Sequence, residues 1–186
     1  MTPPRDLAIA RFAERQHGLE GELLAAVLAA GPGALLSHWA AAELHGLTPY
    51  RASLIDVVVP SKRRSPRGAK YHRTTIHWRD RTDRKHIPVT SVARLLVDLT
   101  DVVTIAHEIT AVIREAAYHR TYSPLATMDA RQRANGRKRI ALLDEAIALY
   151  EAGSAGTRSK EEIRTITRTV ATTSPWTRSS AKPATT

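Results

Sequence analysis

The sequence predicts an α/β protein in which helices pack on a small, mainly antiparallel sheet and the C-terminal half is helical. Two observations predict this fold class. Short apolar runs bounded by proline indicate strands before residue 90. Apolar residues at helical spacing indicate helices before and after those runs. We therefore expect the first half of the chain to form the sheet and the second half to supply helices alone.

The composition favours one globular domain with appendages. The chain has 186 residues, 42% of them hydrophobic and 25% charged, which is enough for one core. Its 28 Lys and Arg outnumber its 18 Asp and Glu, and the formal charge of +10 favours polyanionic partners. The absence of cysteine excludes disulfides, thiolate zinc sites and cysteine nucleophiles. The sequence lacks a signal-peptide core and a membrane-spanning apolar run, so we expect a cytoplasmic protein.

The N-terminal segment has helical patterns. Residues 5–17 fit a helix that ends at Gly18, and residues 20–30 fit a second helix that Gly31-Pro32-Gly33 stops. The stretch LLSHWAAAELHGL, residues 35–47, predicts a two-turn helix from His38 to His45.

Ser37 has two possible roles in this stretch. As an N-cap, its hydroxyl accepts a hydrogen bond from an amide of the first turn, while Gly46 takes the left-handed position after the last turn. As a nucleophile, it needs a base held by a third group, and an adjacent His38 on a helix points elsewhere. The structural role of Ser37 as a cap is the favoured interpretation.

Three segments predict strands. The first is LIDVVVP, which Pro60 ends, and the second is KYHRTTIHW, residues 70–78. The third is HIPV, residues 86–89, which we expect to be an edge or a terminal piece of the sheet because Pro88 cannot donate to a ladder.

Helical patterns follow as far as residue 153. In TSVARLLVDLTD, Thr90 or Ser91 caps a helix with a continuous apolar stripe, and Arg94 and Asp98 fall on the opposite side. We expect these two structural residues to form a solvated i, i+4 pair that stabilises the helix by only ~0.3 kcal/mol. Three more helices are expected: one from a Thr104 cap to His119, one from Ser123-Pro124 to Asn135-Gly136, and one over residues 137–151.

The strongest functional signal is a concentration of positive charge. Residues 61–85 contain ten Lys and Arg and two Asp, a net charge of +8. If the flanking strands form a hairpin, this segment projects as a basic finger with Arg67-Gly68 at its tip, suited to bind phosphate. The alternative is a solvated loop that protects a sheet edge from aggregation. The predicted nucleic-acid-binding residues are Lys62, Arg63, Arg64, Arg67, Lys70 and Arg73.

Signals for catalysis and for metal binding are weaker. None of the eight histidines forms the i, i+4 pair with a third ligand that is typical of a helical zinc site. A GxSxG elbow and a glycine-lysine phosphate loop are also missing, and after Glu162 no carboxylate follows to build a nuclease site. We therefore expect no catalytic residues, no metal and no cofactor.

Four motifs together carry a resemblance to a known family. In order, LLSHWAAAELHGL, IDVVVPSKRR, YHRTTI and IPVTSVARLLVDL are similar to the C-terminal domain of AbiEi-type antitoxins. The same domain is found ahead of restriction-endonuclease-fold domains related to very-short-patch repair nucleases. The resemblance covers about residues 20–153 and rests on the order of the motifs.

The resemblance implies a domain organisation and a function. Residues 1–19 resemble a remnant of a winged-helix region, residues 20–153 the antitoxin-like core, and residues 154–186 the truncated start of a nuclease domain followed by a tail that we expect to be disordered. Such antitoxins bind the DNA of their own operon and neutralise a nucleotidyltransferase-type toxin. The prediction is therefore a DNA-associated, antitoxin-like regulator that is not an enzyme. The alternatives are a module that binds such a toxin and an inactive remnant of the endonuclease.

Overall fold

The computed structural model describes residues 18–134 and 136–154. The predicted helix over residues 5–17 lies outside the described residues, as do the predicted nuclease-domain start after residue 154 and the predicted disorder of residues 171–186. The helices of the described part include none with the length and apolar character needed to cross a membrane.

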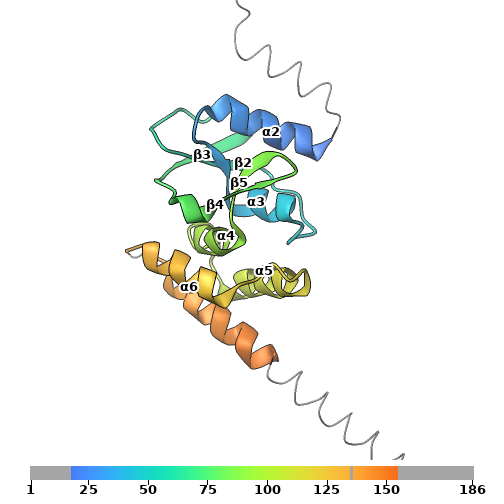
Figure 1. Ribbon diagram of the computed structural model, residues 1–186, viewed down its shortest axis with the longest axis vertical. Helices are drawn as coiled ribbons and strands as arrows, with labels where there is room; N and C mark the ends of the chain where they lie inside the picture. Colours follow the sequence, from blue (N-terminus) through green and yellow to red (C-terminus); the bar gives the residue numbers. More distant parts are fainter. Residues whose placement is uncertain (1–17, 135, 155–186) are drawn as a thin grey trace, which may run out of the picture. The chain divides into compact units, whose positions relative to one another are not determined.

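The described strands form one sheet with the order β3-β2-β1-β5-β4 (Figure 1). Their bounds are β1 Leu35–Leu36, β2 Ile55–Val59, β3 Ala69–Arg73, β4 Arg81–Arg84 and β5 Ile87–Thr90. β1 is antiparallel to β2 and β4 is antiparallel to β5, whereas β1 is parallel to β5 and β2 is parallel to β3. The predicted α/β class is confirmed, but the expectation of a mainly antiparallel sheet is wrong, because the sheet is mixed.

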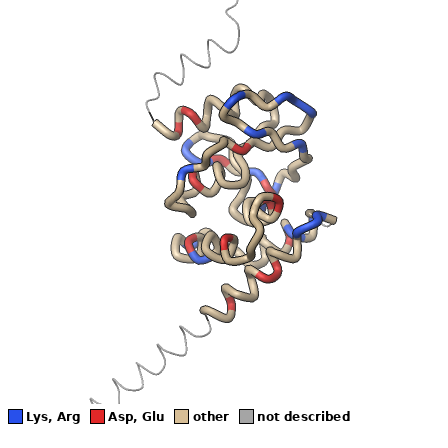
Figure 2. The backbone as a smooth tube through the Cα atoms, turned by 180° about the vertical axis from the view of Figure 1, so that it is seen from behind, with Lys and Arg blue, Asp and Glu red and all other residues tan. Residues whose placement is uncertain are grey.

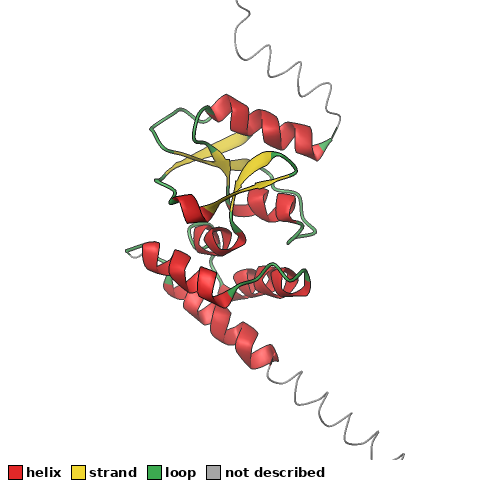
Figure 3. Cartoon of the chain, viewed as in Figure 1, coloured by secondary structure: helices red, strands yellow, loops and turns green. Residues whose placement is uncertain are grey.

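Helices cover both faces of this sheet (Figures 1 and 3). α2 packs on β1, β2 and β5, whereas α3 packs on β2 from the other face and contacts α4, which in turn contacts α5 and α6. A short 3-10 turn, η1, precedes β4, and a further helix spans residues 141–154. The bounds of the named elements are α2 Leu19–Ala30, α3 His38–His45, η1 Trp78–Asp80, α4 Val92–Leu99, α5 Ala106–Tyr118 and α6 Pro124–Arg133.

The predicted helix caps are partly confirmed. The Ser91 hydroxyl accepts a hydrogen bond from the Arg94 amide at 3.3 Å and starts α4. Ser123 starts α6 in the same way, with Pro124 at the first position. The predicted Thr104 cap of α5 is wrong, because Ile105 occupies the N-cap position, and no side chain caps that end.

Strand β5 lies inside the sheet, so the prediction that Pro88 marks an edge strand is wrong. β5 pairs with β4 on one side and with β1 on the other. β1 is two residues long, however, and meets β5 only where Leu36 pairs with Val89. The pairing of β5 with β1 therefore ends beside Pro88. The missing amide hydrogen of Pro88 costs the sheet no hydrogen bond there.

The turn between β4 and β5 is strained. Lys85 and His86 form its two-residue loop, with φ angles of 50° and 63°. Two left-handed residues in such a hairpin define a type I′ turn, for which Asn-Gly is the preferred sequence. Neither Lys nor His relieves the steric cost of this conformation.

Replacing Lys85-His86 by Asn-Gly should therefore raise the free energy of unfolding by about 1 kcal/mol. Urea denaturation measures the change. Ala-Ala at the same two positions retains the unfavourable φ angles and is the matched control, which should not be stabilised. Equal stability of the Asn-Gly and Ala-Ala variants would contradict this account of the turn.

The connection from β2 to β3 is a crossover, not a hairpin. The two strands run parallel in register from Ile55↔Ala69 to Val59↔Arg73, so residues 60–68 return the chain along the sheet. The predicted basic finger, which assumed antiparallel strands, is therefore wrong in shape. β3 is also shorter than expected and ends at Arg73.

Candidate phosphate-binding surface and histidine cluster

The six predicted nucleic-acid-binding residues are all exposed and lie at one edge of the sheet. Lys62, Arg63, Arg64 and Arg67 belong to the crossover, and Lys70 and Arg73 belong to the edge strand β3. Figure 2 shows the cationic segments along the crossover loop, in the upper right of the view. Within residues 18–134 and 136–154, none of the six forms an ion pair with a carboxylate. We call this set the basic edge.

The basic edge wraps around strand β3. Because side chains alternate along a strand, Lys70 and His72 point to one face of the sheet, and Tyr71 and Arg73 point to the other. Lys70 and Asp56 are partners in the register of β3 and β2, so their side chains lie on the same face of the sheet. Lys70 and Arg73 therefore do not contact one flat partner at the same time.

Local hydrogen bonds hold the crossover in a defined path. The Ile55 amide donates to the Gly68 carbonyl at 3.0 Å, and the Tyr71 amide donates to the Ser65 hydroxyl at 2.9 Å. Gly68 has a φ of 86°, which an L side chain rarely adopts. Arg63 passes close to the end of α2, because a methyl group at Gly31 would lie 2.6 Å from its Nη1 atom. The basic edge is thus presented by an anchored backbone.

Of the other four cations of residues 61–85, three contact distant parts of the fold, and Arg79 lies near its exposed neighbour Trp78. Arg81 donates to the Gly33 carbonyl at 3.1 Å, and Arg84 donates to the Leu44 carbonyl at 3.3 Å. Lys85 forms an ion pair with Glu20, and the Arg79 guanidinium lies 5.1 Å from the centre of the Trp78 ring. The charge count of the sequence window therefore overstates the cations that are available to a partner.

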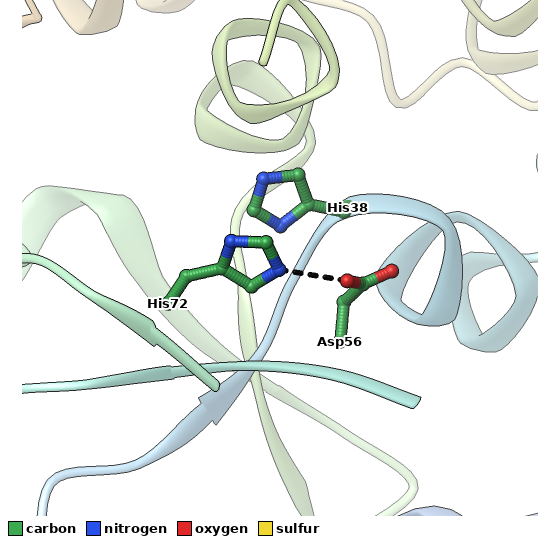
Figure 4. A group of neighbouring side chains, drawn as sticks. All are labelled: His38, Asp56 and His72. Carbon is green, nitrogen blue, oxygen red and sulfur yellow. Dashed lines mark hydrogen bonds and ion pairs between the residues drawn. The ribbon is translucent and has the colours of Figure 1, made fainter. Parts of the chain in front are cut away.

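A second polar group lies beside the basic edge and consists of His38, Asp56 and His72 (Figure 4). His38 begins α3, Asp56 belongs to β2 and His72 belongs to β3. The His72 Nε2 atom lies 2.7 Å from Asp56 Oδ1, a hydrogen bond between the neighbouring strands. The rings of His38 and His72 stack with their centroids 4.0 Å apart and 25° between their planes. We call these three residues the histidine cluster.

His38 has an unusual backbone for the first residue of a helix. Its φ is 48°, in the left-handed region. This turns the imidazole back toward Ser37, whose hydroxyl lies 2.9 Å from His38 Nδ1. Ser37 does occupy the N-cap position, and Gly46 is left-handed as predicted, but the predicted hydrogen bond from the Ser37 hydroxyl to a helix amide is absent. The expectation that His38 points away from Ser37 is also wrong, because it assumed right-handed helical geometry.

Ser37 and His38 are both buried, with 0% and 1% of their surface exposed, so this pair does not present a nucleophile to solvent. Burial, with smaller contributions from the neighbouring His72, Arg137, Lys70 and Arg94, lowers the pKa of His38 to about 2. The imidazole of His38 is therefore neutral at physiological pH.

Arg94 and Asp98 belong to a buried charge network and not to the surface. Their exposed fractions are 4% and 0%, and Arg94 Nε donates to Asp98 Oδ1 at 2.8 Å. Arg137 Nη2 donates to the same oxygen at 3.0 Å, and buried Asp80 lies between Arg94 and Arg133. The predicted solvated pair is wrong, because α4 has contacts on several sides, from α3, α5 and α6.

A scan against protein-family models and a search of curated proteins found no match to this chain. The resemblance to AbiEi-type antitoxins therefore stays a prediction that rests on the four sequence motifs.

Sequence reasoning identified the cations of the basic edge but missed the histidine cluster. The search for a metal site looked for histidines four residues apart on one helix, whereas the cluster joins a helix start to two strands. A weak signal existed in the alternation of Lys70 and His72 along β3, which places both side chains on the face that also carries Asp56. The partnership with His38 depends on a left-handed residue that the helical pattern did not indicate.

Proposed function

We propose that the basic edge binds the phosphate backbone of DNA and that the chain is an antitoxin-like regulatory module that acts without catalysis. One observation carries the proposal: six exposed cations of the basic edge have no carboxylate partner among the described residues, while their neighbours at Arg81, Arg84 and Lys85 are bound within the fold. The anchored crossover supports it, because a fixed backbone lowers the entropy lost on binding.

The number of cations that contact phosphate sets the expected salt dependence of DNA binding. Arginine guanidinium groups bind phosphate oxygens in pairs, and such contacts position a protein on DNA without reading its sequence. The affinity should therefore fall steeply with salt, by a slope of about −0.9 for each phosphate neutralised. If only the four crossover cations contact one backbone, the logarithm of the binding constant should change with a slope of about −3.6 against the logarithm of salt concentration.

Changing Arg63, Arg64 and Arg67 together to Ala should weaken DNA binding and make the salt slope shallower by about 2.7. Fluorescence anisotropy of a labelled duplex of arbitrary sequence, measured from about 50 to 200 mM salt, gives both quantities. Circular dichroism checks that the variant is folded.

A second triple variant separates local contact from overall charge. Arg79, Arg114 and Lys138 are exposed cations away from the basic edge, and their change to Ala removes the same net charge. This control should keep the slope of the unchanged protein. Equal losses in both variants would contradict a specific role for the basic edge.

A toxin of the nucleotidyltransferase type is the second candidate partner. The resemblance suggests this toxin, and a separate observation favours a protein partner in general: α6 exposes Leu125 and Met128, three residues apart on one side of the helix, with exposed fractions of 79% and 55%. If the unchanged protein does not bind duplex DNA at low salt, the DNA proposal fails. Pull-down against a nucleotidyltransferase encoded beside this chain then tests the second candidate.

A further inference from the structure

The histidine cluster brings together three side chains that are common metal ligands. One ligand atom each from His38, Asp56 and His72 lies within 4.8 Å of the others. Figure 4 shows the three side chains converging from the start of α3 and from strands β2 and β3. We propose that these residues form a binding site for a transition-metal dication of the zinc class.

The types of ligand select the metal. Two imidazoles with one carboxylate suit zinc and its first-row neighbours, whereas magnesium and calcium prefer oxygen ligands alone. An imidazole binds a metal through the lone pair of a ring nitrogen that carries no proton. Three protein ligands leave a fourth position for water or for another side chain.

His38 provides an independent observation that points to a ligand. The residue is 1% exposed, and its Nε2 atom has no hydrogen-bond partner among the described residues. Asp101 Oδ2 is 4.0 Å away, which is too far for a hydrogen bond. The other ring nitrogen contacts the Ser37 hydroxyl, and metal-bound histidines usually hold their second nitrogen in such a bond. Nε2 is therefore the nitrogen of His38 that is free to serve as ligand among the described residues.

The backbone at His38 supports the same conclusion. Left-handed conformation in a residue other than glycine is strained and is concentrated at ligand sites and active sites. At His38, the φ of 48° directs the ring over β3 instead of along α3. The buried position of Ser37 and His38 holds this conformation in place.

The site is not fully preorganised. The two imidazoles stack, so their lone pairs do not point at one ion until His72 turns. His72 is half-buried on the edge strand β3, which allows this movement, and the metal then replaces its hydrogen bond to Asp56. Lys70, Arg94 and Arg137 oppose a cation, and Asp56, Asp98 and Asp101 offset their charge. We therefore expect micromolar affinity, weaker than that of a preformed structural zinc site.

Of the three ligands, Asp56 lines a pocket. This pocket has a volume of about 500 Å³, and its other walls include Lys70, Trp39, Tyr50 and Glu108. An ion bound by the three side chains would link the start of α3 to β2 and β3. It would therefore fix the strand that carries Lys70 and Arg73, independently of whether the basic edge binds DNA.

Titration of the full chain with Zn²⁺ in a calorimeter, and with Co²⁺ while recording visible absorption, tests the proposal. We expect one ion per chain and a Co²⁺ spectrum that indicates nitrogen and oxygen ligands in four- or five-fold coordination. His72→Ala should weaken binding at least about tenfold. His72 is half-buried at a sheet edge, so this variant should remain folded, which circular dichroism checks.

Two further variants make the test decisive. His107→Ala removes an exposed histidine of α5 outside the cluster and should leave the affinity unchanged. Asp56→Asn keeps the shape of the side chain, removes its charge and should weaken binding. The proposal is overturned if the unchanged protein binds no stoichiometric ion, or if His72→Ala and His107→Ala bind equally well.

Discussion

Replacing Asp98 by alanine should lower the free energy of unfolding by about 3–5 kcal/mol, because it breaks a buried charge network. The Asp98 carboxylate is 0% exposed and accepts hydrogen bonds from Arg94 at 2.8 Å and from Arg137 at 3.0 Å. Without it, the guanidinium of Arg94, which is 4% exposed, is left in the interior with less compensating charge. An unpaired buried charge costs far more than a lost surface contact.

Urea denaturation of Asp98→Ala measures this loss, provided that the slope against urea is unchanged. Asp144→Ala is the matched control, since Asp144 pairs with Arg131 but is 46% exposed. Removing an exposed ion pair should change stability by less than about 1 kcal/mol. Similar losses of unfolding free energy in the two variants would show that the network around Asp98 stabilises the fold no more than an exposed ion pair does.

The second large effect concerns acid. The folded protein should lose stability as the pH falls below 6.5, because the pKa of His38 is about 2 in the folded state and 6.5 as an unperturbed group. Below pH 6.5 the unfolded chain binds a proton at His38 that the folded chain does not bind. The contribution of neutral His38 to the free energy of unfolding is therefore complete above pH 6.5. It is lost on acidification, by about 1.4 kcal/mol per pH unit.

Unfolding free energies measured at pH 6.5 and pH 5.0 test this, with an expected loss of about 2 kcal/mol from His38. His38→Asn is the informative variant, since asparagine tolerates left-handed φ and does not titrate. Its stability should depend less on pH over this interval. Some dependence should remain, because burial also lowers the pKa of His45, against the opposing hydrogen bond to the Thr90 carbonyl.

Asp98 does not produce the same acid sensitivity. Burial raises the pKa of its carboxyl, although Arg94 and Arg137 oppose this shift. A raised carboxyl pKa means that the folded chain takes up the proton more readily than the unfolded chain, so acidification favours folding at this residue. A pH slope in His38→Asn as steep as that of the unchanged protein would contradict the assignment of the slope to His38.

Elements with a strong local pattern could be predicted from the sequence. α3 has the predicted bounds of His38 and His45, and the stripe of α4 is buried at Leu95, Leu96 and Leu99. β2 was identifiable because a short apolar run ends at Pro60. In each case neighbours in the sequence determine the conformation.

Features that depend on distant residues could not be predicted. β1 has two residues, too few for a pattern, and the exposed β4 consists of charged residues and one Thr. The parallel direction of β3 depends on how residues 60–68 are anchored. The burial of Arg94 and Asp98 depends on Arg137 and on three other helices, and the histidine cluster depends on the left-handed His38. For the functional site, the composition identified the cations. It did not indicate which of them form contacts within the fold and which stay exposed.

The short central strand β1 has a consequence for how the sheet assembles. β4 with β5 and β2 with β3 are local units, each connected by a short loop, and β1 alone joins them. Its contact with β5 pairs Leu36 with Val89, 53 positions apart, so a long segment must be brought together before the two units become one sheet. Such non-local closure slows folding, and the two units are natural candidates to open separately from the native state. Amide hydrogen exchange would show two cooperative units that are joined through the two residues of β1.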